Sequence, residues 1–290
     1  MLEIEDLTTA RVQRPYAIAA ATKRRRRPQS WRGAHGRMMI IAADHPARGA
    51  LRAGADPLAM GNRAGLLERL CTALARPGVT GVLGTPDILE DLLLLGALED
   101  KVVLGSMNRG GLAGSAFEID DRFTAYDADS LAAAGFEGGK MLLRIDPDDP
   151  GTAATLQSCG QAVGALAAHR LMALVEPFVA HREVDGRLHN ELTPEAMIRA
   201  VSVAAGLGTT SAYTWLKVPV VPDMERVMAA TTLPALVLGG EVADDPGAAY
   251  ASWAKALALP AVRGLVIGRS LLYPPGGDVA GSVDRAVGLL

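Results

Sequence analysis

The sequence predicts an α/β protein: a single (β/α)8 TIM barrel over residues 38–290 that follows an N-terminal extension over residues 1–37. Short apolar runs alternate eight times with helical patterns. The runs are apolar throughout, as in parallel strands that are buried on both faces. Eight such units over about 250 residues match a closed barrel. An open doubly wound sheet is the alternative, but no Gly-x-Gly-x-x-Gly fingerprint follows the first run.

The first four strands are predicted where apolar residues cluster between glycine, proline and charged residues. These strands are residues 38–43, 81–84, 101–106 and 140–145. Helical patterns follow them at about residues 63–75, from Pro86, at 127–135 and at 152–168. A longer excursion over residues 108–126 separates the third strand from its helix, and a proline- and aspartate-rich break over residues 146–150 ends the fourth strand.

The last four strands are predicted in the same way, at residues 171–176, 213–218, 235–238 and 264–267. Pro177 is expected to close the fifth strand. Thr193-Pro194-Glu195 then begins a helix with a cap residue, a proline in the first turn and an acidic residue at the favoured end of the helix dipole. Further helices are predicted at residues 224–231, 244–258 and from about 279.

The N-terminal extension combines a predicted helix with a basic run. The helix covers residues 7–21, and Lys23 to Arg27 form the basic run before Pro28. Such a run can bind nucleic acid or an acidic partner. The chain as a whole has a net charge of −3 and the run has no interleaved aromatic residues, which favours a solvated surface segment or a subunit contact. We therefore expect no nucleic-acid partner.

Composition also bears on compartment and membrane association. The two cysteines, Cys71 and Cys159, lack metal-ligand spacing and fit free thiols in a reducing cytoplasm. No apolar run is long enough to cross a bilayer, and the N-terminus lacks a signal-peptide pattern. A cytoplasmic protein without a membrane partner is expected.

Lys217 lies in a short apolar segment, residues 213–220, that reads as a buried strand. Burial or a second nearby cation favours the neutral amine, which can attack a carbonyl group to form a Schiff base. The chain has 29 basic residues, of which only five are lysines, so it uses arginine for most of its positive charge, and a lysine in an apolar strand points to a chemical role. The alternative is a lysine that pairs with an acidic residue or extends from the strand end to solvent.

Other polar residues meet Lys217 in a barrel, because active residues lie at the carboxyl ends of the strands. Glu176 ends the fifth strand, Asp44 follows the first, and Lys140 begins the fourth by these boundaries. Lys140 would favour the neutral form of Lys217, Glu176 would transfer protons, and Asp44 would assist carbinolamine formation or bind a hydroxyl group. Alternatively, Glu176 forms a salt bridge to a lysine and Asp44 is a cap.

A phosphate site is predicted after the seventh and eighth strands, where glycine lets backbone N–H groups approach an anion. Gly239 and Gly240 follow the seventh strand, and Gly268 and Arg269 follow the eighth. Tight turns also need glycine, so the evidence for a phosphate site is the position of these glycines after the last two strands rather than the presence of glycine itself. After the first strand, the further candidates for substrate or phosphate binding are His45 and Arg48.

These residues resemble those of the class I, Schiff-base aldolases of the (β/α)8 superfamily over residues 38–272. The similarity is greatest to the tagatose-bisphosphate and sulfofructose-phosphate branch, with deoxyribose-phosphate and archaeal-type fructose-bisphosphate aldolases as relatives. The matching motifs are Gly139-Lys140, Val175-Glu176-Pro177 and Leu216-Lys217-Val218-Pro219. The resemblance implies that Lys217 is the Schiff-base lysine, Glu176 the proton shuttle and Lys140 its electrostatic partner.

The match to that branch is incomplete. Asp44-His45-Pro46 stands where tagatose-type enzymes carry Asp-Gln-Arg. Asp-His is typical of the archaeal-type enzymes, which carry a tyrosine where this chain has Glu176. The resemblance implies a homo-oligomer that acts on a phosphorylated ketose or keto acid, including 5-keto-2-deoxygluconate 6-phosphate of inositol catabolism. No cofactor and no metal are expected, because the iminium is the electron sink.

Two other classes of function stay open. A metal-dependent lyase or hydrolase would use His45, His181 and His189, although no ligand spacing supports it and the last two lie in a predicted loop. A non-catalytic barrel would bind a phosphate metabolite, or a partner through residues 1–37.

Overall fold

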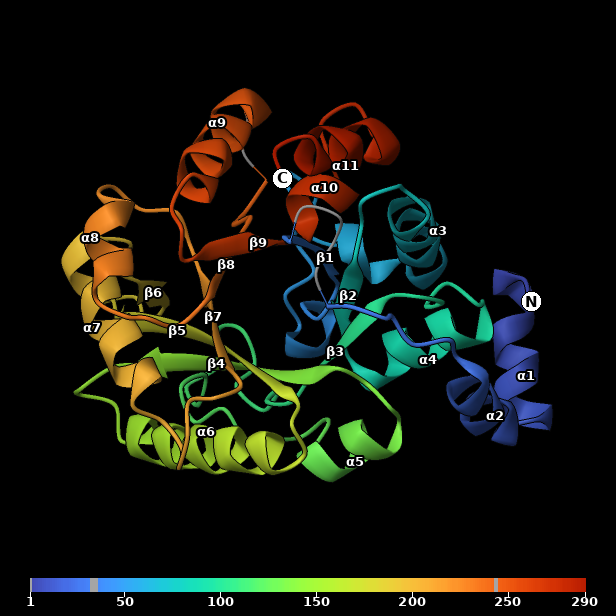
Figure 1. Cartoon of the computed structure of the whole chain (residues 1–290), viewed down its shortest axis with the longest axis horizontal. Coiled ribbons are helices and arrows are strands. Elements are labelled where there is room, and N and C mark those ends of the chain that lie inside the picture. Colours follow the sequence, from blue (N-terminus) through green and yellow to red (C-terminus); the bar gives the residue numbers. More distant parts are fainter. Residues whose placement is uncertain (1, 32–35, 243–244) are drawn as a thin grey trace.

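The computed structural model describes residues 2–31, 36–242 and 245–290. It contains a closed barrel of eight parallel strands, which confirms the predicted (β/α)8 fold (Figure 1). The barrel strands are β1 (Met38–Ala42), β2 (Gly81–Gly84), β3 (Val102–Ser106), β4 (Gly138–Ile145), β5 (Met172–Arg182), β7 (Thr214–Val218), β8 (Ala235–Leu238) and β9 (Val262–Ile267). They follow one another around the barrel in chain order, and β9 pairs with β1 to close it.

Helices surround this barrel in the alternation that the sequence predicts (Figure 1). They are α3 (Arg63–Leu74), α4 (Pro86–Leu94), α5 (Ala128–Ala133), α6 (Gly151–Ala168), α7 (Pro194–Ala205), α8 (Met224–Ala229), α9 (Pro246–Leu257), α10 (Arg269–Leu272) and α11 (Val279–Val287). The Thr193 hydroxyl caps α7 as expected, by accepting the N–H of Ala196. Asp244, the predicted first residue of the helix at α9, lies outside the described residues. The short helix α10 was not predicted.

The strands are apolar throughout because both of their faces are buried. On β1, Met38 and Ile40 point into the barrel core, whereas Met39 and Ile41 pack against the surrounding helices. Successive strand residues face opposite sides, so the inner face of β1 continues through Ala42 to Asp44. The same alternation determines which polar residues reach the barrel interior on every other strand.

The fifth strand is longer than predicted, and Pro177 does not end it. The ladder between β5 and β7 stops at Val175, so Pro177 stands where β5 has no neighbour on that side and its missing N–H is tolerated. β5 continues alongside β4 and then turns back as a hairpin with β6 (Leu188–Asn190). His181 and His189 are paired across this hairpin, so their assignment to a loop was wrong.

The start of the fourth strand also differs from the prediction. β4 begins at Gly138, so Lys140 is its third residue rather than its first. Gly138 and Gly139 are weak strand residues by composition, but close neighbours require them: a Cβ at Gly138 would lie 2.5 Å from the carbonyl oxygen of Met172. Lys140 therefore stands in the middle of the barrel wall, with its side chain on the inner face.

The prediction of a single helix over residues 7–21 is wrong. The structure has the turn η1 (Ile4–Asp6) and two helices, α1 (Leu7–Gln13) and α2 (Tyr16–Arg24). Arg14 between the helices leaves the helical conformation, because the proline that follows disfavours it there. Figure 1 shows α2 beside α4 on the outside of the barrel.

Part of the basic run is buried rather than solvated. The Arg25 guanidinium binds the Glu137 carboxylate at 2.9 Å and donates to the carbonyl oxygens of Lys101 at 2.8 Å and Gly135 at 2.6 Å. Arg27 binds the same carboxylate at 3.0 Å. These contacts tie the segment that precedes β1 to the opposite end of the barrel wall from the predicted site. Among the described helices, none is both long enough and apolar enough to cross a membrane.

Candidate active site

The predicted catalytic side chains meet inside the barrel: three lie on the neighbouring strands β4, β5 and β7, and Asp44 reaches them from the end of β1. Lys217 Nζ on β7 lies 2.8 Å from Glu176 Oε1 on β5. Lys140 on β4 contacts the other oxygen of the same carboxylate, and its Nζ is 3.2 Å from Asp44 Oδ2 after β1. Lys217 and Lys140 are only 4% and 2% exposed. An alternating chain of charges thus runs across the barrel interior.

The charges in this chain depend on one another. Burial raises the pKa of Glu176, but the ammonium groups of Lys140 and Lys217 outweigh it and hold that pKa at about 2. Burial lowers the pKa of Lys140 to about 8, against the opposing effect of Asp44 and Glu176. Arg109 and Lys140 keep the pKa of Asp44 well below its usual value despite burial. Both carboxylates are therefore ionised at neutral pH.

Glu176 lies between the amines of Lys217 and Lys140, which were predicted to act on each other directly as like charges. Each ammonium contacts a different oxygen of this carboxylate. The arrangement satisfies the salt-bridge alternative for Glu176 and also places its carboxylate 2.8 Å from Lys217, beside any substrate that reaches this amine. Once deprotonated, Lys217 is a nucleophile facing the cavity.

Sequence reasoning missed two residues that hold Asp44. Arg109 Nη2 lies 2.9 Å from Asp44 Oδ2, and Arg109 Nη1 donates to the Asp44 carbonyl oxygen at 3.0 Å. Ser106 Oγ donates to Asp44 Oδ2 at 3.2 Å. Ser106 ends β3 and Arg109 follows it closely, so their position at the carboxyl end of a strand was the available signal. Asp44 is thus an ion-pair partner rather than a helix cap.

The residues predicted to bind phosphate gather on the β8 and β9 side of the same cavity. Gly240 has a φ of 70°, in the left-handed region that glycine favours. A Cβ at Gly268 would lie 2.4 Å from the Ala42 carbonyl oxygen, so only glycine fits there. The Arg269 guanidinium lies 3.4 Å from Glu241 Oε1, and its Nε is buried without a hydrogen-bond partner among the described residues.

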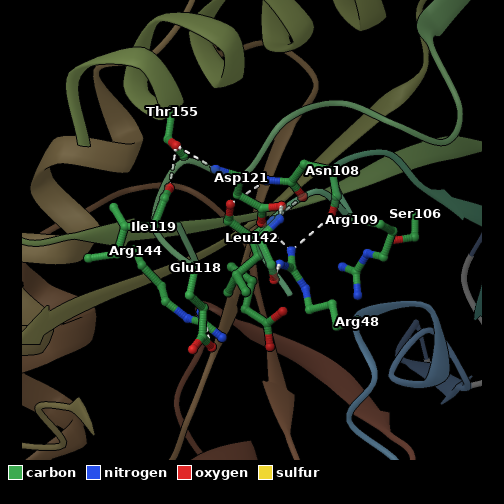
Figure 2. Close-up of polar contacts among 12 residues, drawn as sticks. Arg48, Ser106, Asn108, Arg109, Glu118, Ile119, Asp121, Leu142, Arg144 and Thr155 are labelled. Atoms are coloured by element: carbon green, nitrogen blue, oxygen red, sulfur yellow. Dashed lines mark hydrogen bonds and ion pairs between the residues drawn. The ribbon is translucent and has the colours of Figure 1, made fainter. Parts of the chain in front are cut away.

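His45 and Arg48 also line the cavity. Burial lowers the pKa of His45 to about 3, so its imidazole is neutral at neutral pH, with Nδ1 3.8 Å from Asp44 Oδ1. Arg48 forms structural contacts within the chain: it donates to the carbonyl oxygens of Gly111 at 2.7 Å and Asn108 at 2.8 Å. Figure 2 shows Arg48 beside Asn108. Direct binding of substrate by Arg48 stays a prediction.

The cavity has a volume of about 480 Å³ and opens at the carboxyl ends of the strands. Its floor carries the charges around Lys217, and its walls carry the glycines and arginines. His181 and His189, the other residues of the metal-dependent alternative, pair on the β5–β6 hairpin with Glu191 and Glu183. Within residues 2–31, 36–242 and 245–290, no three His, Cys, Asp or Glu side chains gather where they could hold a metal ion.

A closed barrel of eight parallel strands with helices between them defines the class: a (β/α)8 TIM barrel, here with two buried lysines and a carboxylate in its interior. The chain belongs to the Cgl0159-like family, whose model matches residues 36–287. It is similar to the crystal structure of Cgl0159 from Corynebacterium glutamicum (Brevibacterium flavum), with 52% identity over 98% of this chain and 95% of that chain and a TM-score of 0.95.

More distant structures share the fold. A Schiff-base-forming fructose-1,6-bisphosphate aldolase has 16% identity over 94% of this chain and 99% of that chain, with a TM-score of 0.65. An archaeal fructose 1,6-bisphosphate aldolase has 16% identity over 94% and 98%, with a TM-score of 0.66. No curated protein matches the chain in sequence. These structures share the (β/α)8 fold with this chain, and its membership of the class I aldolases and of any branch within them stays a prediction.

Proposed function

We propose that this protein is a class I aldolase that cleaves or forms a carbon–carbon bond in a phosphorylated ketose or keto acid through a Schiff base on Lys217. The observation that carries the proposal is the contact of buried Lys217 with Glu176, which is shared with Lys140 and continued to Asp44. A nucleophilic amine needs an adjacent proton acceptor and a second group that holds this acceptor in place. The four side chains supply both.

The steps can be written with these residues. The Lys217 nitrogen attacks the substrate carbonyl carbon, and the carbonyl oxygen takes up a proton to give a carbinolamine. Loss of water leaves the iminium. Glu176 then accepts the proton of the substrate hydroxyl group, the carbon–carbon bond breaks, and its electron pair moves to the iminium to give an enamine. An aldehyde leaves. Protonation at carbon and hydrolysis restore the Lys217 amine and release the second product.

The substrate proposal rests on the opposite wall of the cavity. Gly239, Gly240, Gly268 and Arg269 form a place for a phosphate group, at the position where barrels commonly bind one. Among phosphorylated keto acids we propose 5-keto-2-deoxygluconate 6-phosphate, with dihydroxyacetone phosphate and malonate semialdehyde as products. Fructose 1,6-bisphosphate, named for the distant structures, is the comparison substrate. We also propose a cytoplasmic homo-oligomer.

Borohydride trapping tests the Schiff base. Wild type, Lys217→Met and Lys255→Met are incubated with dihydroxyacetone phosphate and borohydride, and intact mass and peptide mapping locate the adduct. Lys255 is an exposed lysine on α9 and serves as the matched control. We expect one adduct in wild type and Lys255→Met, located at residue 217, and none in Lys217→Met. An adduct on another residue, or none with dihydroxyacetone phosphate or either six-carbon substrate, would overturn the proposal.

A further inference from the structure

Arg144 lies across the barrel mouth from the predicted phosphate site. On β4, Lys140, Leu142 and Arg144 share the inner face, so Arg144 stands about 13 Å further along the strand toward solvent than Lys140. In the closed order of strands, three strands separate β4 from β9 in either direction. Arg144 and Arg269 therefore lie on opposite walls of one cavity, and both line it.

The Arg144 side chain is confined and only partly partnered. It is 15% exposed, and its Nη1 binds Glu118 Oε1 at 2.6 Å. Its Nε is buried and has no hydrogen-bond partner within the described residues. Phe178 is its register neighbour on β5 and Leu142 precedes it on the same face, so the surroundings are partly apolar, with the charges of Glu118, Arg48 and Asp121 nearby. Such surroundings strengthen the attraction of a guanidinium for an anion.

The segment that positions Arg144 is fixed by its own contacts (Figure 2). Glu118 also accepts the N–H of Gly114 at 2.8 Å, and a Cβ at Gly111 would lie 2.2 Å from the Glu118 carbonyl oxygen. Asp121 binds Arg48 and accepts the N–H of Gly111 at 2.9 Å. Thr155 on α6 donates to the Ile119 carbonyl oxygen at 2.6 Å. The loop after β3 thus holds Glu118, and through it Arg144, in one arrangement.

We propose that Arg144 binds a terminal carboxylate of the substrate, at the end of the molecule opposite its phosphate. The proposal rests on the proposed aldolase function and narrows its substrate class to phosphorylated keto acids. A guanidinium presents a planar fork that matches a carboxylate with two parallel hydrogen bonds. Glu118 offsets part of the positive charge here, which suits a monoanionic carboxylate better than a second, dianionic phosphate.

The test uses ligands that cannot form a Schiff base. 6-Phosphogluconate and sorbitol 6-phosphate share a six-carbon chain and a phosphate, and differ only in a carboxylate against a hydroxymethyl group at the far end. Glucitol 1,6-bisphosphate carries a second phosphate there instead. Isothermal titration calorimetry gives the Kd of each for wild type, Arg144→Met, Arg144→Lys and Arg122→Met. Arg122 is 68% exposed and pairs with Asp120, so its replacement controls for the loss of one positive charge nearby.

Wild type and Arg122→Met are expected to bind 6-phosphogluconate about 10- to 100-fold more tightly than sorbitol 6-phosphate, the range of a charged hydrogen-bonded pair. Arg144→Met is expected to lose this ratio and keep the Kd of sorbitol 6-phosphate within about twofold. Arg144→Lys can still pair with Glu118 but lacks the fork, so it should retain a preference of only a few-fold and show that loss of the ratio is not misfolding.

Three results would overturn the proposal: a wild-type ratio below about twofold, an equal loss for both ligands in Arg144→Met, or tightest binding of the bisphosphate. The borohydride experiment is independent of these titrations. An adduct on Lys217 without a carboxylate preference would leave the aldolase and remove the carboxylate site. A carboxylate preference without any adduct would leave the carboxylate site and remove the aldolase function.

Discussion

At the level of single residues, one carboxylate lies between two buried ammonium groups. Glu176 touches both Lys217 and Lys140, and Lys140 in turn touches Asp44. Removing one member of a buried charged set leaves its partner without compensation. The network is therefore expected to act as a unit, so that single replacements have effects that do not add.

A replacement of Glu176 that keeps its size tests whether its carboxylate takes part in proton transfer. Glu176→Gln keeps the size of the side chain but removes the proton acceptor beside Lys217. The rate of substrate cleavage is expected to fall about 100- to 10,000-fold, the usual contribution of a positioned acid or base. Steady-state cleavage of 5-keto-2-deoxygluconate 6-phosphate measures this. A loss below about tenfold would remove Glu176 from proton transfer.

The same residue makes stability depend on acid. The folded pKa of Glu176, about 2, is below its usual value of 4.5, so the unfolded chain binds this proton more readily. The stabilisation is fully present above about pH 4.5 and is lost as the pH falls toward 2. Urea unfolding at pH 6, 5, 4 and 3 should show a steeper loss in wild type than in Glu176→Gln. Parallel curves would contradict this.

At the level of elements, the segment that precedes β1 is held by a buried ion pair. Arg25 and Glu137 are far apart in sequence, and the Glu137 carboxylate also accepts the N–H of Val103 at 2.8 Å. One carboxylate thus joins the basic run to β3 and to the start of β4. The basic run therefore has a structural use within the chain itself.

Arg25→Met should lower the free energy of unfolding by about 3 kcal/mol, because it leaves Glu137 buried with only part of its compensation. Arg26→Met is the matched control. Arg26 pairs with Asp100, and both side chains are more than half exposed, so its loss should not change stability measurably. Urea denaturation of both variants gives the comparison. Equal effects would show that the buried pair is not what holds the segment.

At the level of the whole molecule, closure of the barrel depends on a close approach between its last and first strands. Gly264 on β9 has a φ of 143°, and a Cβ there would lie 2.0 Å from the carbonyl oxygen of Met38 on β1. Only glycine allows this contact. Because Asp44 follows β1 while Lys217 lies on β7, closure also determines the distances within the candidate site.

Gly264→Ala should lower the free energy of unfolding by about 3 kcal/mol, since the new methyl group strains the backbone and separates β9 from β1. Gly160→Ala on α6 is the control: its Cβ would have no neighbour closer than 3.7 Å, and alanine suits a helix better by about 0.5 to 1 kcal/mol. Urea denaturation distinguishes the two. A neutral Gly264→Ala would mean that the strands adapt without strain.

The sequence by itself determined the repeating architecture and pointed to Lys217 and Glu176 as the centre of the candidate site. Short apolar runs and the helical patterns between them are local properties, and they placed all eight barrel strands to within a few residues, except for the end of β5. Lys217 and Glu176 were identifiable because a charged residue in such a run must have a partner or a use. The exceptions, such as β5 beyond Pro177, occur where a neighbouring strand changes what the local pattern allows.

Only the tertiary structure decided which distant residues meet. The contacts of Arg109 and Ser106 with Asp44, of Glu118 with Arg144, and of Arg25 with Glu137 all join segments that no local pattern relates. Such contacts depend on strand register, on closure of the barrel and on the path of the loop after β3. The reason is physical: local sequence sets which side of an element is buried, whereas the partner of a buried charge is set by how the whole chain packs.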